Sequence, residues 1–101
     1  RLDLYDYLLK GDATDDIPVS SNKSYFGHLL GASGAIETLV SVMGLEHGMM
    51  PASMNLDNPD PECRLRLAGS APERLSRPVV LKNSFGFGGD NAVLILRSRQ
   101  Q

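Results

Sequence analysis

The 101-residue sequence lacks several features that would place it in a specialised class of protein. It contains one cysteine and no tryptophan, and glycines interrupt its longest apolar stretch. One cysteine excludes a disulfide scaffold and is typical of a reducing, cytoplasmic compartment. No apolar run is long enough to span a bilayer and no signal peptide is recognisable, so we predict no membrane association.

Charge of one sign is also missing. The sequence has 10 lysine and arginine residues against 12 aspartate and glutamate residues, a net charge of −2, with no basic patch of the kind that binds nucleic acid. A chain that is 42% hydrophobic and 22% charged is ordinary for one modest globular domain. Because the first residue is not methionine, we expect the numbering to begin inside a longer chain.

The first informative segment places Lys23 and His28 five residues apart, just before an apolar run from Leu29 to about Leu45. That run predicts a largely buried helix with His28 near its N-terminus, where N–H groups and the helix dipole favour a neutral imidazole. A neutral imidazole can donate one hydrogen bond and accept another, as polarising a carbonyl requires. Lys23 would share the same pocket. The alternative, a solvated loop lysine and a helix-capping histidine, is the more usual explanation of such a pair in an arbitrary chain.

The second informative segment is a glycine-rich loop, Asn83–Asn91, between buried strands predicted at 79–81 and 92–96. Its three central glycines permit positive φ, so the loop could aim N–H groups at an oxygen atom. Phe85 and Phe87 could then line a narrow pocket for an acyl chain. A plain hairpin turn with core aromatics is the alternative.

The remaining elements are predicted from local patterns, with turn-rich loops between them. We expect a helix at 2–10, strands at 17–20 and 64–67, an extended segment at 49–54 and an acidic loop at 55–63. Strands that alternate with a buried helix indicate an α/β layered architecture.

Three segments together resemble the C-terminal part of the β-ketoacyl-ACP synthase family, the condensing enzymes of fatty acid and polyketide synthesis. Asn22–Glu37 reads NKSYFGHLLGASGAIE, 55–60 reads NLDNPD and Asn83–Asn91 reads NSFGFGGDN. The resemblance runs from about residue 17 to 96, so we divide the chain into a poorly matched helix and linker, 1–16, and a ketosynthase segment, 17–101. It implies an α/β fold that is part of the second half of a thiolase-like layered α-β-α-β-α sandwich with mixed sheets.

The resemblance also implies roles for residues at matching positions. His28 corresponds to the histidine that binds the malonyl thioester and assists its decarboxylation. Lys23 corresponds to a lysine that organises the site and pairs with Glu37. Phe87 corresponds to a gatekeeper whose backbone N–H donates to the oxyanion, and Phe85 would line the same pocket. Supporting positions in the loop are Asn83, Gly86 and Gly88.

Other positions depart from the family pattern. The family nucleophile is a cysteine at a helix N-terminus in the first half of the subunit, whereas Cys63 follows two prolines and several acids and is not predicted to act as one. His47 is predicted to end a helix. Asp90 replaces a threonine, which puts the hydrogen bonding of the loop and the preferred substrate in question, since a carboxylate there would repel a malonyl group unless it faces away.

The resemblance therefore predicts the C-terminal segment of a synthase that elongates fatty acids with malonyl-ACP. A polyketide ketosynthase and a catalytically silent partner, like the chain-length factors, remain alternatives. The implied partners are an acyl carrier protein and the rest of the ketosynthase subunit, in a homodimer or a ketosynthase heterodimer. No metal and no tightly bound cofactor is implied, because the substrates are carried on ACP phosphopantetheine. Thiolases fit less well because this chain lacks their second cysteine in a C-x-G context.

Overall fold

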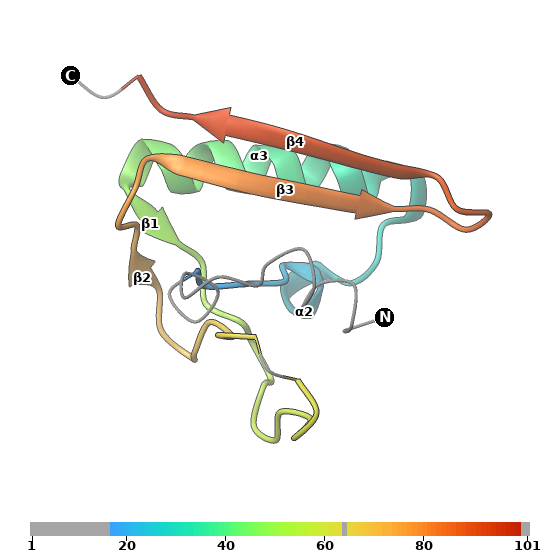
Figure 1. Ribbon diagram of the computed structural model, residues 1–101, viewed down its shortest axis with the longest axis horizontal. Helices are drawn as coiled ribbons and strands as arrows, with labels where there is room; N and C mark the ends of the chain where they lie inside the picture. Colours follow the sequence, from blue (N-terminus) through green and yellow to red (C-terminus); the bar gives the residue numbers. More distant parts are fainter. Residues whose placement is uncertain (1–16, 64, 100–101) are drawn as a thin grey trace.

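The computed structural model of the chain describes residues 17–63 and 65–99 (Figure 1). The helix predicted at 2–10 and the first residue of the strand predicted at 64–67 lie outside the described residues. In chain order the elements are α2 Lys23–Phe26, the 3₁₀ turn η2 Leu30–Ala32, α3 Ser33–His47, β1 Met49–Met50, β2 Glu73–Arg74, β3 Val79–Phe85 and β4 Asn91–Arg97.

The main helix, α3, ends where the sequence predicts but begins later. Gly48 adopts the left-handed conformation, with φ 64°, and stops the helix directly after His47. The prediction that the helix starts at Leu29 is wrong, because Leu30 has a φ of 50°, which an α-helix does not accommodate. No helix within the described ranges is long and apolar enough to cross a membrane.

Gly44 allows the chain to turn back tightly against the end of α3. A Cβ atom at this position would lie 2.7 Å from the backbone oxygen of Met49, so only glycine fits. Met49 and Met50 then form β1, which pairs in antiparallel fashion with β2. The extended segment predicted at 49–54 is confirmed for these two residues, and the strand does not continue beyond them.

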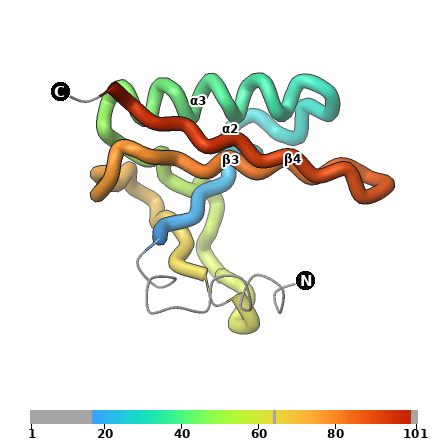
Figure 2. Tube along the Cα trace, turned by 45° about the horizontal axis from the view of Figure 1, so that its top comes forward, coloured from blue at the N-terminus to red at the C-terminus, as the bar shows by residue number. Residues whose placement is uncertain are grey.

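The hairpin of β3 and β4 is the largest sheet in the described part of the chain. The two strands pair in antiparallel register from Val79 opposite Arg97 to Phe85 opposite Asn91. The connecting loop is residues 86–90, shorter than the predicted Asn83–Asn91, because the pairing of the strands continues to its glycines. Figures 1 and 2 show the hairpin running alongside α3, and β3 is the strand with more contacts to this helix. The hairpin therefore sets the glycine-rich loop near the N-terminal end of α3.

The strands predicted at 17–20 and 64–67 are reduced to one parallel bridge between Val19 and Leu67. The Val19 N–H donates to the Arg66 carbonyl at 2.8 Å, and the Ala68 N–H donates to the Val19 carbonyl at 2.8 Å. Apart from this bridge, both sheets among the described residues are two-stranded and antiparallel. The α/β character is confirmed as a helix packed on strands, whereas a mixed layered sandwich is not contained in the described residues.

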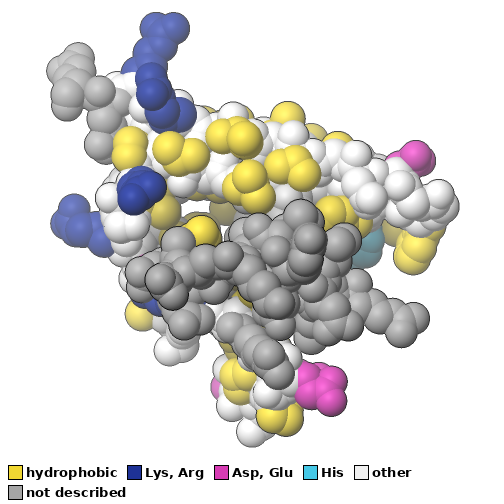
Figure 3. Space-filling view, in the orientation of Figure 1, with side chains coloured by type: hydrophobic (Ala, Val, Ile, Leu, Met, Phe, Trp, Pro, Cys, Tyr) yellow, Lys and Arg dark blue, Asp and Glu magenta, His cyan; other side chains and the backbone are white. Residues whose placement is uncertain are grey.

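The hydrophobic core is small. Only Leu45, Ala52 and Ala68 are buried hydrophobic residues in the part of the chain that the structure describes. Ile95 is 71% exposed, and apolar side chains lie in a row along the hairpin in Figure 3. The predictions of a largely buried helix and of two buried strands are thus wrong here. The described elements cover only the inner face of the hairpin, and Leu39 and Met43 of α3 are 54% and 49% exposed.

Candidate functional site

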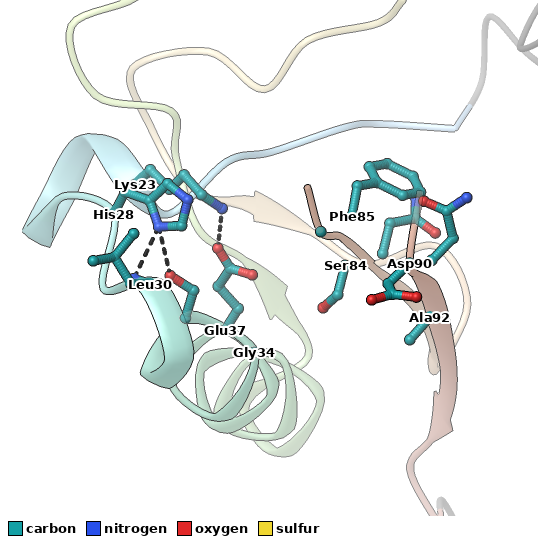
Figure 4. A pocket seen from close by; sticks show the side chains of 13 residues that line it. Lys23, His28, Leu30, Gly34, Glu37, Ser84, Phe85, Asp90 and Ala92 are labelled. Atoms are coloured by element: carbon teal, nitrogen blue, oxygen red, sulfur yellow. Dashed lines mark hydrogen bonds and ion pairs between the residues drawn. The ribbon is translucent and has the colours of Figure 1, made fainter. Parts of the chain in front are cut away.

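A pocket opens between the N-terminal end of α3 and the loop end of the β3–β4 hairpin (Figure 4). Its volume of about 600 Å³ is within the range that binds small ligands. The lining residues are Lys23, His28, Leu30, Ser33, Gly34, Glu37, Asn83, Ser84, Phe85, Gly86, Asp90, Asn91 and Ala92. The two segments singled out in the sequence therefore meet at one site.

His28 is held by hydrogen bonds to its Nδ1 atom. The Leu30 N–H donates to Nδ1 at 3.0 Å, and Ser33 Oγ lies 3.0 Å from the same nitrogen. Ser33 Oγ also accepts a hydrogen bond from the Leu29 N–H at 2.9 Å, so its own proton is free to point at Nδ1. Figure 4 shows both contacts converging on the ring.

These contacts select one tautomer of His28. A backbone N–H can only donate, so Nδ1 must act as an acceptor and cannot carry a proton. The ring proton then resides on Nε2, which is the nitrogen left to donate to a ligand in the pocket. The neutral, donating imidazole predicted from the sequence is thus favoured by hydrogen bonds to Nδ1 rather than by direct placement at the start of α3.

Leu30 contributes to this geometry through its backbone. Its φ of 50° is in the left-handed region, which costs a non-glycine residue on the order of 1 kcal/mol or more, and its side chain is 73% exposed. Exposure means that side-chain packing does not explain the conformation. The backbone N–H of this strained residue is also one of the two groups that contact His28 Nδ1.

Glu37 lies between two lysines. One carboxylate oxygen, Oε1, bonds to Lys23 Nζ, which confirms the predicted pair, and the other, Oε2, lies 2.8 Å from Lys82 Nζ. The Glu37 and Lys82 side chains are 12% and 6% exposed, whereas the Lys23 side chain is 44% exposed. In the predicted Lys23–Glu37 pair, therefore, only Glu37 is largely buried. Of the two lysines that contact Glu37, Lys82 is the more buried.

The pKa of Glu37 reflects these opposing influences. Burial of the carboxyl group raises its pKa, while hydrogen bonds and charge attraction from Lys23 and Lys82 lower it by more. The net result is a pKa below the ordinary value of 4.5. Glu37 is therefore a carboxylate at neutral pH, and it suits a supporting role better than proton transfer.

Lys82, like Ser33, supports the site and was missed by the sequence analysis. It lies on β3 with Val80 and Ser84 as its neighbours on the face toward α3, and its Nζ also bonds to Ser84 Oγ. The signal was present as a lysine directly after the apolar run 79–81, two residues from Val80 and so on the same face of the strand. A lysine in a strand is usually solvated, however, and its acidic partner is far away in the sequence.

The glycine-rich loop closes the hairpin with its own hydrogen bonds. The Gly86 N–H donates to the Asp90 carbonyl at 2.6 Å, and the Gly89 N–H donates to the Gly86 carbonyl at 3.3 Å. Gly88 and Gly89 have φ values of 92° and 91°, so the predicted positive φ is confirmed. Two of the N–H groups that the sequence suggested for a ligand oxygen are thus used within the loop.

The structure brings together most of the predicted site residues, but not all of them. Asn83, Phe85 and Gly86 line the pocket with Lys23, His28 and Glu37, as the list above shows. Phe87 is 99% exposed and does not line it, and Gly88 is also outside the lining set. No described residue accepts a hydrogen bond from the Phe87 N–H. The narrow pocket lined by two phenylalanines is therefore incomplete within the described residues.

Of the other residues discussed in the sequence analysis, Asp90 lines the pocket, whereas Cys63 and His47 do not. Asp90 lines the pocket opposite Lys23 and Glu37 (Figure 4). Cys63 is half-buried in the acidic loop, where its N–H donates to the Asp60 carbonyl at 2.9 Å, and it is not among the lining residues. His47 is the last residue of α3, as predicted, and does not line the pocket either.

Comparison with known proteins shows the family of this chain. Residues 4–57 match the model of a family described as "Beta-ketoacyl synthase, C-terminal domain". This match begins ahead of residue 17, where we placed a domain boundary, and that boundary remains a prediction.

Several individual proteins are similar over most of this chain. The chain is 46% identical over 89 residues to 3-oxoacyl-[acyl-carrier-protein] synthase 2 of Rhizobium meliloti, an alignment that covers 88% of this chain and 21% of that protein. It is 46% identical to the synthase of the same name from Synechocystis, over 89% of this chain and 22% of that protein. The chain is 39% identical to the synthase of the same name from Staphylococcus aureus, over 86% of this chain and 22% of that protein. The chain therefore spans about a fifth of the length of these curated relatives.

Proposed function

The chain belongs to the β-ketoacyl synthase family, of which it carries the C-terminal domain, and on this premise we propose that it is the malonyl-binding segment of a 3-oxoacyl-ACP synthase. The reaction would be the decarboxylative Claisen condensation of malonyl-ACP with an acyl thioester on the enzyme, in fatty acid elongation. The names of the relatives and the grouping of Lys23, His28 and Glu37 around one pocket support this proposal.

His28 would act in the decarboxylation step. The bond between the malonyl α-carbon and its carboxylate breaks, carbon dioxide leaves, and the electron pair forms an enolate on the thioester. The Nε2–H of His28 would donate to the thioester oxygen, where negative charge develops. A donor that strengthens only as charge forms stabilises the transition state more than the bound substrate.

Phe87 would act in the condensation step. The enolate carbon attacks the carbonyl of the enzyme-bound acyl thioester, a carbon–carbon bond forms, and the cysteine thiolate leaves. The Phe87 N–H is a candidate donor to the oxyanion of this step, because no described residue accepts its hydrogen bond. This assignment requires that the exposed loop faces the acyl thioester in the whole protein.

Lys23 would supply positive charge beside the reacting group. Its ammonium group lines the pocket and is held by Glu37, which is itself held by the buried Lys82. A charge fixed in this way costs little reorganisation during the reaction. Glu37 and Lys82 would act as positioning residues that do not touch the substrate.

Other parts of the enzyme would lie on sequence beyond these 101 residues. We propose that the nucleophilic cysteine is among them, because Cys63 is not one of the residues that line the pocket. The exposed apolar face of the β3–β4 hairpin fits a place inside a thiolase-like layered sandwich completed by further chain. An acyl carrier protein would deliver both substrates on phosphopantetheine, so the reaction as proposed uses no resident cofactor.

One observation carries the proposal more than any other. The hydrogen bonds to Nδ1 leave His28 Nε2–H as a donor in the same pocket as the charged Lys23. The test is incubation of the full-length protein with an acyl-ACP and malonyl-ACP, followed by mass analysis of the carrier. We expect a 3-oxoacyl-ACP two carbons longer, with one carbon dioxide released per product. Acyl transfer without chain extension would contradict the proposal.

A further inference from the structure

Lys82 is a buried charge that the proposed reaction does not use directly. Its side chain is 6% exposed, and its Nζ contacts Glu37 Oε2 at 2.8 Å and also Ser84 Oγ. Burial of a lysine is costly, and a hydrogen bond to a serine and a charge pair to one carboxylate oxygen offset this cost. An apolar side chain of similar size would fill this space equally well, so the presence of a charge requires an explanation.

The explanation lies in the balance of charge around the pocket. Four titratable residues line the pocket: Lys23, His28, Glu37 and Asp90. With His28 as the neutral Nε2–H tautomer, the two carboxylates outnumber the single lysine among these four. Lys82 does not line the pocket, but it pairs with Glu37 Oε2. When its positive charge is added to those four residues, their net charge is zero.

Asp90 is the group that makes this balance necessary. Its backbone carbonyl closes the loop by accepting a hydrogen bond from the Gly86 N–H. Asp90 also lines the pocket, across from Glu37 in Figure 4. Unit charges within about 10 Å interact appreciably at physiological ionic strength. An uncompensated carboxylate on the rim would therefore disfavour any ligand that carries a carboxylate of its own.

We propose that Lys82 is a specificity-determining residue whose charge offsets Asp90, so that the pocket admits a malonyl group with its carboxylate. This inference rests on the proposed function. In this proposal, Lys82 and Asp90 together determine how well the pocket binds the anionic malonyl substrate relative to the uncharged acyl substrate. Neither residue needs to touch the substrate, because the effect acts through the charge of the pocket.

The test uses three variants of the full-length protein: Lys82→Met, Asp90→Asn and the double variant. Lys82→Met keeps an unbranched side chain, one atom shorter, and removes the charge. We expect it to raise the KM for malonyl-ACP about tenfold and to change the KM for acyl-ACP less than twofold, an effect that shrinks at high salt. Asp90→Asn in the Lys82→Met background should return the malonyl-ACP KM to within about threefold of the wild-type value.

Each result supports or overturns the inference. An equal rise of both KM values, or no recovery in the double variant, would show that Lys82 only supports the fold. If Lys82→Met does not fold, Asp90→Asn alone decides the question: it should lower the malonyl-ACP KM, and an unchanged value overturns the proposal. Lys82→Arg keeps the charge, so its malonyl-ACP KM should rise less than that of Lys82→Met. Failure of the proposed function itself is distinct, because the wild-type protein would then form no 3-oxoacyl product.

Discussion

Ser33 Oγ lies 3.0 Å from His28 Nδ1, and the same oxygen accepts the Leu29 N–H at 2.9 Å. The hydroxyl thus joins the first residue of α3 to the backbone just after the histidine, and its proton completes the set of donors around Nδ1. Ser33 is 9% exposed, so solvent has little access to this contact. The orientation of His28 therefore depends on a neighbouring serine side chain as well as on the backbone.

Ser33→Ala should weaken His28 without removing it. One donor to Nδ1 is lost and the Leu30 N–H remains, so we expect malonyl-ACP decarboxylation by the full-length protein to fall about fivefold, as for the loss of one ordinary hydrogen bond. Nitrogen-15 NMR of the histidine should show a smaller preference for the Nε2–H tautomer. Ser41→Ala, on the same helix with its hydroxyl bonded to the Glu37 carbonyl, is the control. Equal rates and tautomer signals in wild type and Ser33→Ala would refute the role.

Glu37→Gln should destabilise the protein. The amide cannot balance the charge of Lys82, whose side chain is 6% exposed, and removing one partner of a buried pair costs about 3 kcal/mol. The half-exposed Lys23 contributes little to this loss, because water screens its charge. Urea unfolding of the full-length protein measures the change, with Glu46→Gln on the exposed part of the same helix as control. A loss no larger than in the control would contradict the buried pairing.

The low pKa of Glu37 predicts a pH dependence of stability. Its folded-state pKa lies below the ordinary value of 4.5, so the unfolded chain binds a proton first as the pH falls. The contribution of Glu37 is therefore present above pH 4.5 and is lost as the pH falls below 4.5 through the folded-state pKa. Between pH 6 and pH 3, the free energy of unfolding should decrease more steeply for the wild type than for Glu37→Gln. Parallel curves would argue against the shift.

The 101-residue chain by itself should not fold cooperatively. Its buried hydrophobic residues in the described part are Leu45, Ala52 and Ala68, whereas Ile95 and Leu81 are 71% and 59% exposed. A two-stranded hairpin with so little cover is marginal in water. We expect aggregation, or a broad thermal transition by far-UV circular dichroism. A sharp cooperative melt of the isolated chain would contradict this expectation.

Short-range patterns in the sequence predict much of the site. The position of His28 beside the helix and the glycine-rich hairpin loop follow from local patterns, whereas the pairing of Lys23 with Glu37 follows from the family resemblance, and the structure contains all three. The end of α3 after His47 is also predictable, because Gly48 can adopt the left-handed conformation.

The features that escape prediction depend on tertiary context. The φ of 50° at Leu30 shortens α3, and nothing in a leucine signals it. Lys82 finds its carboxylate only when β3 packs on α3, so its role is invisible in the strand itself. The exposure of Phe87 and of the outer face of the hairpin reflects how little of the larger fold these residues contain, since the chain covers about a fifth of its relatives.

The central claim is that His28 assists decarboxylation of the malonyl group, and its most direct test is release of labelled carbon dioxide from malonyl-ACP by the full-length protein. His28→Ala is compared with His47→Ala, which removes the other histidine at the far end of α3, outside the pocket lining. We predict that His28→Ala slows release about a hundredfold, as for the loss of a donor to developing charge, while His47→Ala stays within twofold of wild type. Undiminished release by folded His28→Ala protein would contradict the account.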